Sequence, residues 1–81
     1  MEYRYTDHAK ARINERRVPA DWLASVLESP QRILRQSIHR EIRQSVFEKD
    51  GKRWLLRVVC EGDRVITAIL TSKIDRYGGT Q

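Results

Sequence analysis

His8, Arg12 and Arg16 follow one another at intervals of four residues, and their side chains suit chemistry on an anion. On a helix that turns ~100° per residue, Arg12 and Arg16 fall in the apolar sector and His8 lies at its border. That apolar sector is defined by Tyr5, Ala9 and Ile13. Arginine grips phosphate with a planar fork, and histidine exchanges protons near neutral pH. The stripe predicts one wall of an anion-binding cleft between this helix and a sheet. The alternative is that the arginine stems only cover apolar surface and carry their charges to water or to a carboxylate such as Glu15 or Asp21.

Basic residues outnumber acidic ones, and most of them are arginine. The 81-residue chain has 16 Lys and Arg against 11 Asp and Glu, 12 of the 16 are Arg, and the net charge is +5. A small Arg-rich domain favours a polyanionic partner such as nucleic acid. With 40% hydrophobic and 33% charged residues the chain is expected to be globular, and its length predicts a single domain over residues 1–81.

The single cysteine and the lack of a long apolar run indicate the cellular compartment in which the protein is expected. Cys60 has no second cysteine to pair with and lies in an apolar run, so we expect a buried thiol in a reducing compartment. The chain contains no run of ~18 apolar residues, and its N-terminus is polar, so we expect neither a membrane span nor a signal peptide. These features predict a cytoplasmic protein without a membrane partner.

Two helices are expected before residue 30. Thr6 is a suitable N-cap for a first helix that ends near Arg17. Val18-Pro19 begins a second helix with Pro at its first position, where the missing N–H costs nothing, and Ser29-Pro30 ends it. The preceding residues 1–5 are either a short strand or a lead-in. The second helix has an apolar stripe formed by Trp22, Leu23, Val26 and Leu27.

Beyond residue 30 the apolar pattern changes to a period of two, which predicts strands at residues 32–37, 40–48, 52–61 and 64–71. Asp50-Gly51 is a strong signal for a two-residue hairpin loop, and Gly62-Asp63 reads as a second one. The expected fold class is therefore α+β, with two N-terminal helices packed on a four-stranded antiparallel meander.

Tight hairpins would determine the register of this meander. Lys49 then pairs with Lys52, which places Arg43 opposite Val58. In the second hairpin Val58 lies opposite Thr67, so Arg43 and Thr67 share a face about 10 Å apart. The other face is the more apolar one, and we expect the helices to pack there, although a slip of one residue would exchange the faces. That apolar face carries Ile42, Val46, Leu55, Val59, Ile66, Ala68 and Leu70, with Gln44 and Arg57 among them.

Several catalytic classes are excluded by the spacing of the reactive residues. The two His residues and the single Cys lack zinc-site spacing, no Gly-rich phosphate loop is present, and the acidic residues are too scattered for a two-metal nuclease. We expect neither a metal nor a cofactor. Histidines, arginines and hydroxyls suit metal-independent RNA cleavage, which needs a base for the 2′-hydroxyl, cations for the charge on phosphorus and an acid for the leaving 5′-oxygen.

Two segments resemble a group of small bacterial domains of unknown function that is related to the RelE/BrnT-like toxins, whose fold is shared with barnase-type ribonucleases. HAKARINERRVPADWLASVLESP is similar to their opening His-x3-Arg-x3-Arg helix and second helix ending in Pro, and RVITAILTSKIDRY is similar to their closing strand. The likeness runs from about His8 to Tyr77. It implies the toxin of a bacterial toxin–antitoxin pair, a metal-independent ribonuclease of the mRNA interferase type whose partners are RNA and a small acidic antitoxin.

The resemblance also implies roles for single residues. His8 would be the acid/base, Arg12 and Arg40 would hold the scissile phosphate, and Thr67 would position a phosphate oxygen or the 2′-hydroxyl. Ile69 stands where the family often has an aromatic hydroxyl, which favours the alternative of a non-catalytic module that binds nucleic acid or a protein. Arg40 and Thr67 fall on opposite faces in the register above, so either that register contains a bulge or one of the two residues is structural.

We expect four further basic side chains to contact RNA: Arg16, Arg43, Arg57 and Lys73. The alternative for Arg43 and Arg57 is pairing with glutamates across strands. His39 is interpreted as a surface histidine at a turn. Trp54 would either stack on a base or pack in the core or against a partner.

Overall fold

Thr6 caps the first helix as predicted. In the computed structural model, which describes residues 2–74, Thr6 Oγ1 accepts a hydrogen bond from the Ala9 amide at 3.0 Å. Helix α1 spans Asp7–Glu15 and therefore ends two residues before the predicted Arg17. Helix α2 spans Ala20–Glu28, with Pro19 as its N-cap rather than its first helical residue. Neither helix has the length and apolar character needed to cross a membrane.

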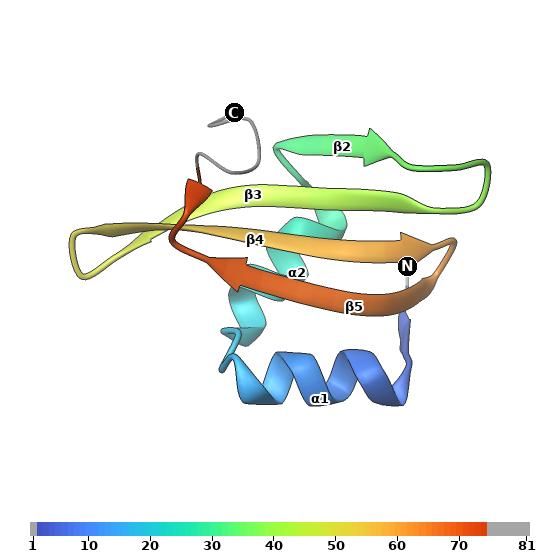
Figure 1. Ribbon diagram of the computed structural model, residues 1–81, viewed down its shortest axis with the longest axis horizontal. Helices are drawn as coiled ribbons and strands as arrows, with labels where there is room; N and C mark the ends of the chain where they lie inside the picture. The colour runs from blue at the N-terminus through green and yellow to red at the C-terminus, as the bar shows by residue number, and fades with distance from the viewer. Residues whose placement is uncertain (1, 75–81) are drawn as a thin grey trace.

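Five strands form one mixed sheet in the order β1-β5-β4-β3-β2 (Figure 1). They are β1 (Arg4–Tyr5), β2 (Arg32–Arg35), β3 (Glu41–Lys49), β4 (Lys52–Glu61) and β5 (Arg64–Thr71). The class is α+β and β2 to β5 form the predicted antiparallel meander, but β1 adds a fifth strand parallel to β5. The prediction of a four-stranded, purely antiparallel sheet is therefore wrong, because two residues are too few for an alternating pattern to reveal a strand.

The first hairpin has the predicted turn and register. Asp50 and Gly51 both have positive φ angles, 55° and 73°, as a type I′ turn requires. Lys49 pairs with Lys52, and Arg43 lies opposite Val58. The local preference of one dipeptide therefore determines the pairing along the whole of β3 and β4.

A bulge in β5 changes the register of the second hairpin. Val59 pairs with Thr67 and Val58 with Ala68, which leaves Ile66 as the extra residue of β5. The predicted pairing of Val58 with Thr67 is therefore wrong by one residue. Beyond the bulge, every side chain of β5 lies on the face opposite to the one predicted.

Thr6 supplies a physical reason for the bulge. Its hydroxyl donates a hydrogen bond to the Ile66 carbonyl at 3.0 Å, and its amide donates to the Val65 carbonyl at 3.1 Å. The extra residue thus offers its backbone oxygen to the segment that joins β1 to α1. Since the donor lies 60 residues away in sequence, no local pattern in β5 could indicate it.

Both helices lie on the same side of the sheet (Figure 1), and this is not the predicted side. The bulge brings Ala68 to the face that carries Leu56, so the apolar residues of β4 and β5 that the prediction had separated now share one core. Trp22 of α2 stacks on Phe47 of β3 with 4.6 Å between ring centroids. The core beneath the helices consists of Ala9, Val18, Val26, Leu27, Leu56, Val58, Cys60, Val65 and Ala68.

Cys60 is a buried, free thiol in this core, as expected. Burial raises the pKa of Cys60 to about 11, and burial also raises the pKa of the neighbouring Tyr5 hydroxyl. The Cys60 thiol is therefore protonated at neutral pH and has no access to a substrate, so it packs as a small apolar residue.

Candidate nucleic-acid interface

The four residues predicted to be catalytic do not gather in one place. His8 is exposed on α1, and Arg12 on the same helix forms an ion pair with Glu15 at 2.5 Å. Thr67 lies on the sheet face that carries no helix, as the strand register shows, and Arg40, just before β3, binds Glu61 of the same face. The sheet therefore stands between the two pairs, and the predicted cleft wall of His8, Arg12 and Arg16 is a solvent-facing side of α1.

Arg40 and Thr67 share a face because of the bulge in β5. Of the two explanations offered for their apparent separation, the bulge is correct. The Arg40 guanidinium, however, binds the carboxylate of Glu61 through Nε at 3.0 Å and Nη2 at 2.8 Å. This charge-assisted contact holds Arg40 beside a carboxylate.

The residues predicted to contact RNA also lie apart from one another. Arg43 faces the helices and forms an ion pair with Glu41 of its own strand at 2.5 Å. Arg57 lies on the other face, where its Nε donates to Gln44 Oε1 at 3.0 Å. Lys73 is exposed after the end of β5, and Arg16 is exposed at the C-cap of α1.

Arg16 is one wall of a pocket of about 440 Å³ between the α1–α2 connection and the tip of the β3–β4 hairpin. We call it the tryptophan pocket, and its lining consists of Arg16, Arg17, Pro19, Trp22, Lys49, Asp50, Lys52, Trp54 and Leu70. A pocket of this volume can accommodate a flat ring system of the size of a nucleobase.

Two indole rings contribute the apolar surface of the tryptophan pocket. Trp22 is half-buried and packs on Phe47 with an interplanar angle of 7°. Trp54 is also half-buried, and the Lys52 ammonium lies 5.0 Å from its ring centroid. This cation–π contact places a positive charge directly beside an aromatic surface.

Four basic side chains and a single carboxylate, that of Asp50, line the tryptophan pocket. Arg16, Arg17, Lys49 and Lys52 take part in none of the ion pairs found within residues 2–74. An excess of cations with no carboxylate partners attracts an anion. Until an anion binds, the repulsion between these clustered positive charges opposes folding.

Arg17 occupies a backbone position at which glycine is usual. The Val18 amide donates to the Ile13 carbonyl at 3.1 Å and the Arg17 amide to the Asn14 carbonyl at 3.2 Å, which is the Schellman pattern of a helix end. Arg17 has a φ angle of 53°, in the left-handed region. A residue with a side chain in this region lowers the stability of the fold by roughly 1 kcal/mol relative to glycine. The chain nevertheless has an arginine here, and its side chain adds a cation to the tryptophan pocket.

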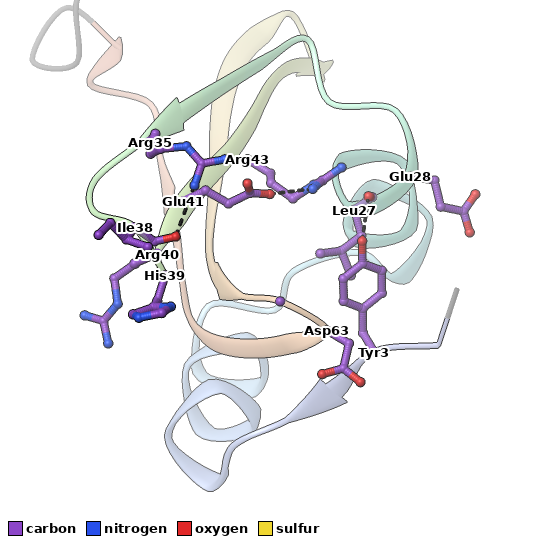
Figure 2. A pocket seen from close by; sticks show the side chains of 11 residues that line it. Tyr3, Leu27, Glu28, Arg35, Ile38, His39, Arg40, Glu41, Arg43 and Asp63 are labelled. Carbon is purple, nitrogen blue, oxygen red and sulfur yellow. Dashed lines mark hydrogen bonds and ion pairs between the residues drawn. The ribbon is translucent and has the colours of Figure 1, made fainter.

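A second pocket, of about 640 Å³, lies at the other end of β3 (Figure 2). We call it the arginine pocket, and it is lined by Tyr3, Leu27, Glu28, Arg35, Ile38, His39, Arg40, Glu41, Arg43, Gly62 and Asp63. Arg43 directs its guanidinium toward the end of α2, where Nε is buried without a hydrogen-bond partner within the described part of the chain. His39 is exposed on the β2–β3 loop beside Arg40. The pocket thus brings together a histidine and three arginines.

Sequence reasoning identified Arg16 and considered Trp54, but it missed Arg17, Lys49 and Lys52. The available signal was the Asp50-Gly51 turn with a lysine on each side, because a tight hairpin places both lysines at its tip. Within residues 2–74, no three His, Cys, Asp or Glu side chains are grouped so as to hold a metal ion. Comparisons of the chain with family models, with curated proteins and with solved structures gave no match.

Proposed function

We propose that the domain binds single-stranded RNA, with the tryptophan pocket as its central contact. The observation that carries this proposal is the combination of two half-buried indoles with four basic side chains outside any ion pair in the described chain. Indole faces stack on unpaired bases, and a basic rim holds the adjoining phosphates. The net charge of +5 supports the same partner.

A single strand fits this site better than a duplex. Bases in a duplex are stacked on one another and offer no face to Trp22 or Trp54, whereas an unpaired base exposes both faces. The resemblance of the chain to the RelE/BrnT-like toxins supports RNA rather than DNA. The chemistry of the pocket itself favours no particular base, because every base has a π surface.

The strained Arg17 gives a test in which stability and binding change in opposite directions. In Arg17→Gly we expect the free energy of unfolding to stay the same or to rise by up to about 1 kcal/mol, since glycine relieves the left-handed strain. We expect the affinity for a ten-nucleotide oligouridine to fall about 3- to 10-fold, with a shallower dependence of log K on log salt, because one phosphate contact is lost. Fluorescence anisotropy and chemical denaturation measure the two effects.

Arg12→Gln is the matched control, since it removes one arginine from the same helix but outside the pocket. Its affinity for RNA is expected to stay within about 2-fold of the wild type, because Arg12 does not line the pocket. The variant should also stay folded, because an exposed ion pair such as that with Glu15 contributes little to stability. Equal losses of affinity in Arg12→Gln and Arg17→Gly would mean that net charge alone attracts RNA, and the tryptophan pocket would lose its role. Binding that is independent of salt would remove nucleic acid as a partner.

A second candidate function is cleavage of the bound RNA, and the observation that favours it is the arginine pocket. There His39 lies beside Arg40, in a pocket that Arg35 and Arg43 also line. In metal-independent cleavage a base takes the 2′-hydroxyl proton, the 2′-oxygen bonds to phosphorus, and the P–O5′ bond breaks as an acid protonates the 5′-oxygen. We assign both proton transfers to His39 instead of His8: it takes the 2′-hydroxyl proton and, as the imidazolium, gives it to the 5′-oxygen. We assign the charge on phosphorus to Arg35, which forms no ion pair with a described residue, whereas Arg40 and Arg43 are paired with Glu61 and Glu41.

A comparison of the two histidines tests this assignment. Expression of the protein should fragment cellular RNA and slow growth, and His39→Ala should abolish both effects while leaving the melting temperature within about 2 °C, because the side chain is exposed. His8→Ala should behave as the wild type. Loss of activity in His8→Ala alone would restore the assignment implied by the sequence, and intact RNA with the wild type would leave binding as the function.

A further inference from the structure

Strand β2 forms one edge of the sheet, and within residues 2–74 no strand lies on its outer side (Figure 1). We propose that this edge binds an extended acidic peptide segment of a partner protein, which adds a strand next to β2. The proposal is independent of RNA binding at the tryptophan pocket, which lies at the far end of β3 and shares no residue with β2. It gives Arg35 and Ile38, which also line the arginine pocket, a role other than RNA cleavage.

The outward backbone groups of β2 follow from its pairing with β3. The Gln36 amide donates to the Arg40 carbonyl at 2.9 Å, so the N–H of Gln36 points toward the chain of β3. Hydrogen-bonded pairs alternate along an antiparallel ladder, and Ile33 and Arg35 therefore belong to the intervening positions. Their N–H and C=O groups point away from β3 and are available to an incoming strand.

Apolar side chains beside this edge are unusually exposed. Ile33 in β2 is 49% exposed and Ile38 in the β2–β3 loop is 83% exposed, and these are the large hydrophobic side chains that the described part of the chain leaves exposed. Both flank the same edge, where an added strand would cover apolar surface. Ile33 lies outside the arginine pocket, and an aliphatic side chain offers RNA neither a charge nor a stacking surface, so a peptide is the better occupant of this edge.

The charged side chains of β2 indicate which charge a bound peptide should carry. Arg32 and Arg35 are exposed and form no ion pair with the residues described, and Arg35 donates only to the Ile38 carbonyl, at 3.2 Å. A second copy of the chain would place these arginines against their own counterparts, and the repulsion would oppose pairing. An acidic strand instead gains two opposite-charge neighbours.

The strand register predicts the order of side chains in a peptide strand that would fit this edge. Arg32 and Leu34 lie on the face without helices, and Ile33 and Arg35 lie on the helix-covered face. Directly paired residues of neighbouring strands share a face. An added strand therefore needs acidic residues opposite the two arginines and apolar residues opposite the two central positions, which gives the order Glu-Val-Val-Glu. This order is the same in both chain directions, so it fits a parallel or an antiparallel strand.

The test is a titration of the full-length protein with acetyl-Thr-Glu-Val-Val-Glu-Thr-amide, followed by amide chemical shifts in NMR. We expect the largest shifts at Ile33 and Arg35. The control peptide acetyl-Thr-Val-Glu-Glu-Val-Thr-amide has the same composition and charge in the wrong order, and we expect it to bind at least 5-fold more weakly. Equal affinities for the two peptides, shifts centred elsewhere, or no binding at about 10 mM peptide would each overturn the proposal.

A charge-reversed pair of variants checks the role of the arginines. We expect Arg32→Glu with Arg35→Glu to bind the Glu-Val-Val-Glu peptide at least 10-fold more weakly and to prefer the corresponding Lys-Val-Val-Lys peptide. Lys10→Glu with Arg53→Glu changes the net charge equally at exposed positions away from β2 and should bind as the wild type does. A similar loss in both double variants would show that the edge does not recognise the peptide, and circular dichroism confirms that each variant is folded.

Discussion

Replacing Trp54 with alanine is expected to weaken the binding of single-stranded RNA by roughly 5- to 150-fold, because stacking on an aromatic side chain contributes about 1–3 kcal/mol per base. Trp54 is half-buried and lines the tryptophan pocket, and Lys52 lies over its ring. Removal of the indole takes away the stacking surface and also the cation–π contact that positions Lys52. Anisotropy titrations with oligouridine at fixed salt measure the change.

Trp54→Phe is the control that separates stacking from folding. Phenylalanine retains an aromatic face, so its affinity for RNA should stay within about 5-fold of the wild type. Since Trp54 also packs opposite Phe47 in the sheet, Trp54→Ala will lose some stability, and affinities must be compared where circular dichroism shows both variants folded. RNA affinity unchanged in folded Trp54→Ala would show that no base stacks there.

Replacing Leu56 with alanine is expected to lower the free energy of unfolding by about 2–5 kcal/mol, as is usual for a fully buried leucine. Leu56 has no exposed surface and belongs to the core beneath the helices. Truncation leaves a cavity that β4, paired on both sides, cannot close by moving. Urea denaturation followed by circular dichroism gives the difference.

The matched control is Ile33→Ala, which also shortens an aliphatic side chain on the helix-covered face. Ile33 is 49% exposed at the edge, so the loss should be less than about 1 kcal/mol. Leu56→Val serves as a milder variant if alanine prevents folding. Similar losses at Leu56 and Ile33 would contradict the burial of Leu56 in the core and the exposure of Ile33 at the edge of the sheet.

The features of this fold that could be predicted are those encoded by neighbouring residues. Thr6 caps a helix because its hydroxyl reaches an amide three residues away, and Asp50-Gly51 makes a hairpin because both residues tolerate positive φ angles. The tight turn then determines the register of β3 and β4. Such signals do not depend on the rest of the molecule, and the structure contains them as predicted.

The candidate site was only partly predictable, because its walls come from distant segments. Arg16 and Arg17 end α1, whereas Lys49, Lys52 and Trp54 belong to a hairpin more than 30 residues later. Neither segment has a periodic pattern that points to the other. The stripe of His8, Arg12 and Arg16 misled for the same reason: helical spacing indicates which residues share a side, but only packing decides which side is buried.

Contacts between near neighbours in the chain specify the α+β class, both helices, the four strands of the meander and the tight first turn. Which face of the sheet the helices cover depends on contacts between distant segments. The bulge at Ile66 contributes to the packing of that face: the Ile66 carbonyl binds Thr6 from the other end of the chain, and the end of β5 shifts by one residue, which moves Ala68 to the face of Leu56. Because side chains alternate along a strand, this one long-range hydrogen-bonded bulge exchanges the two faces of β5, and with them the surroundings of Thr67 and Ala68.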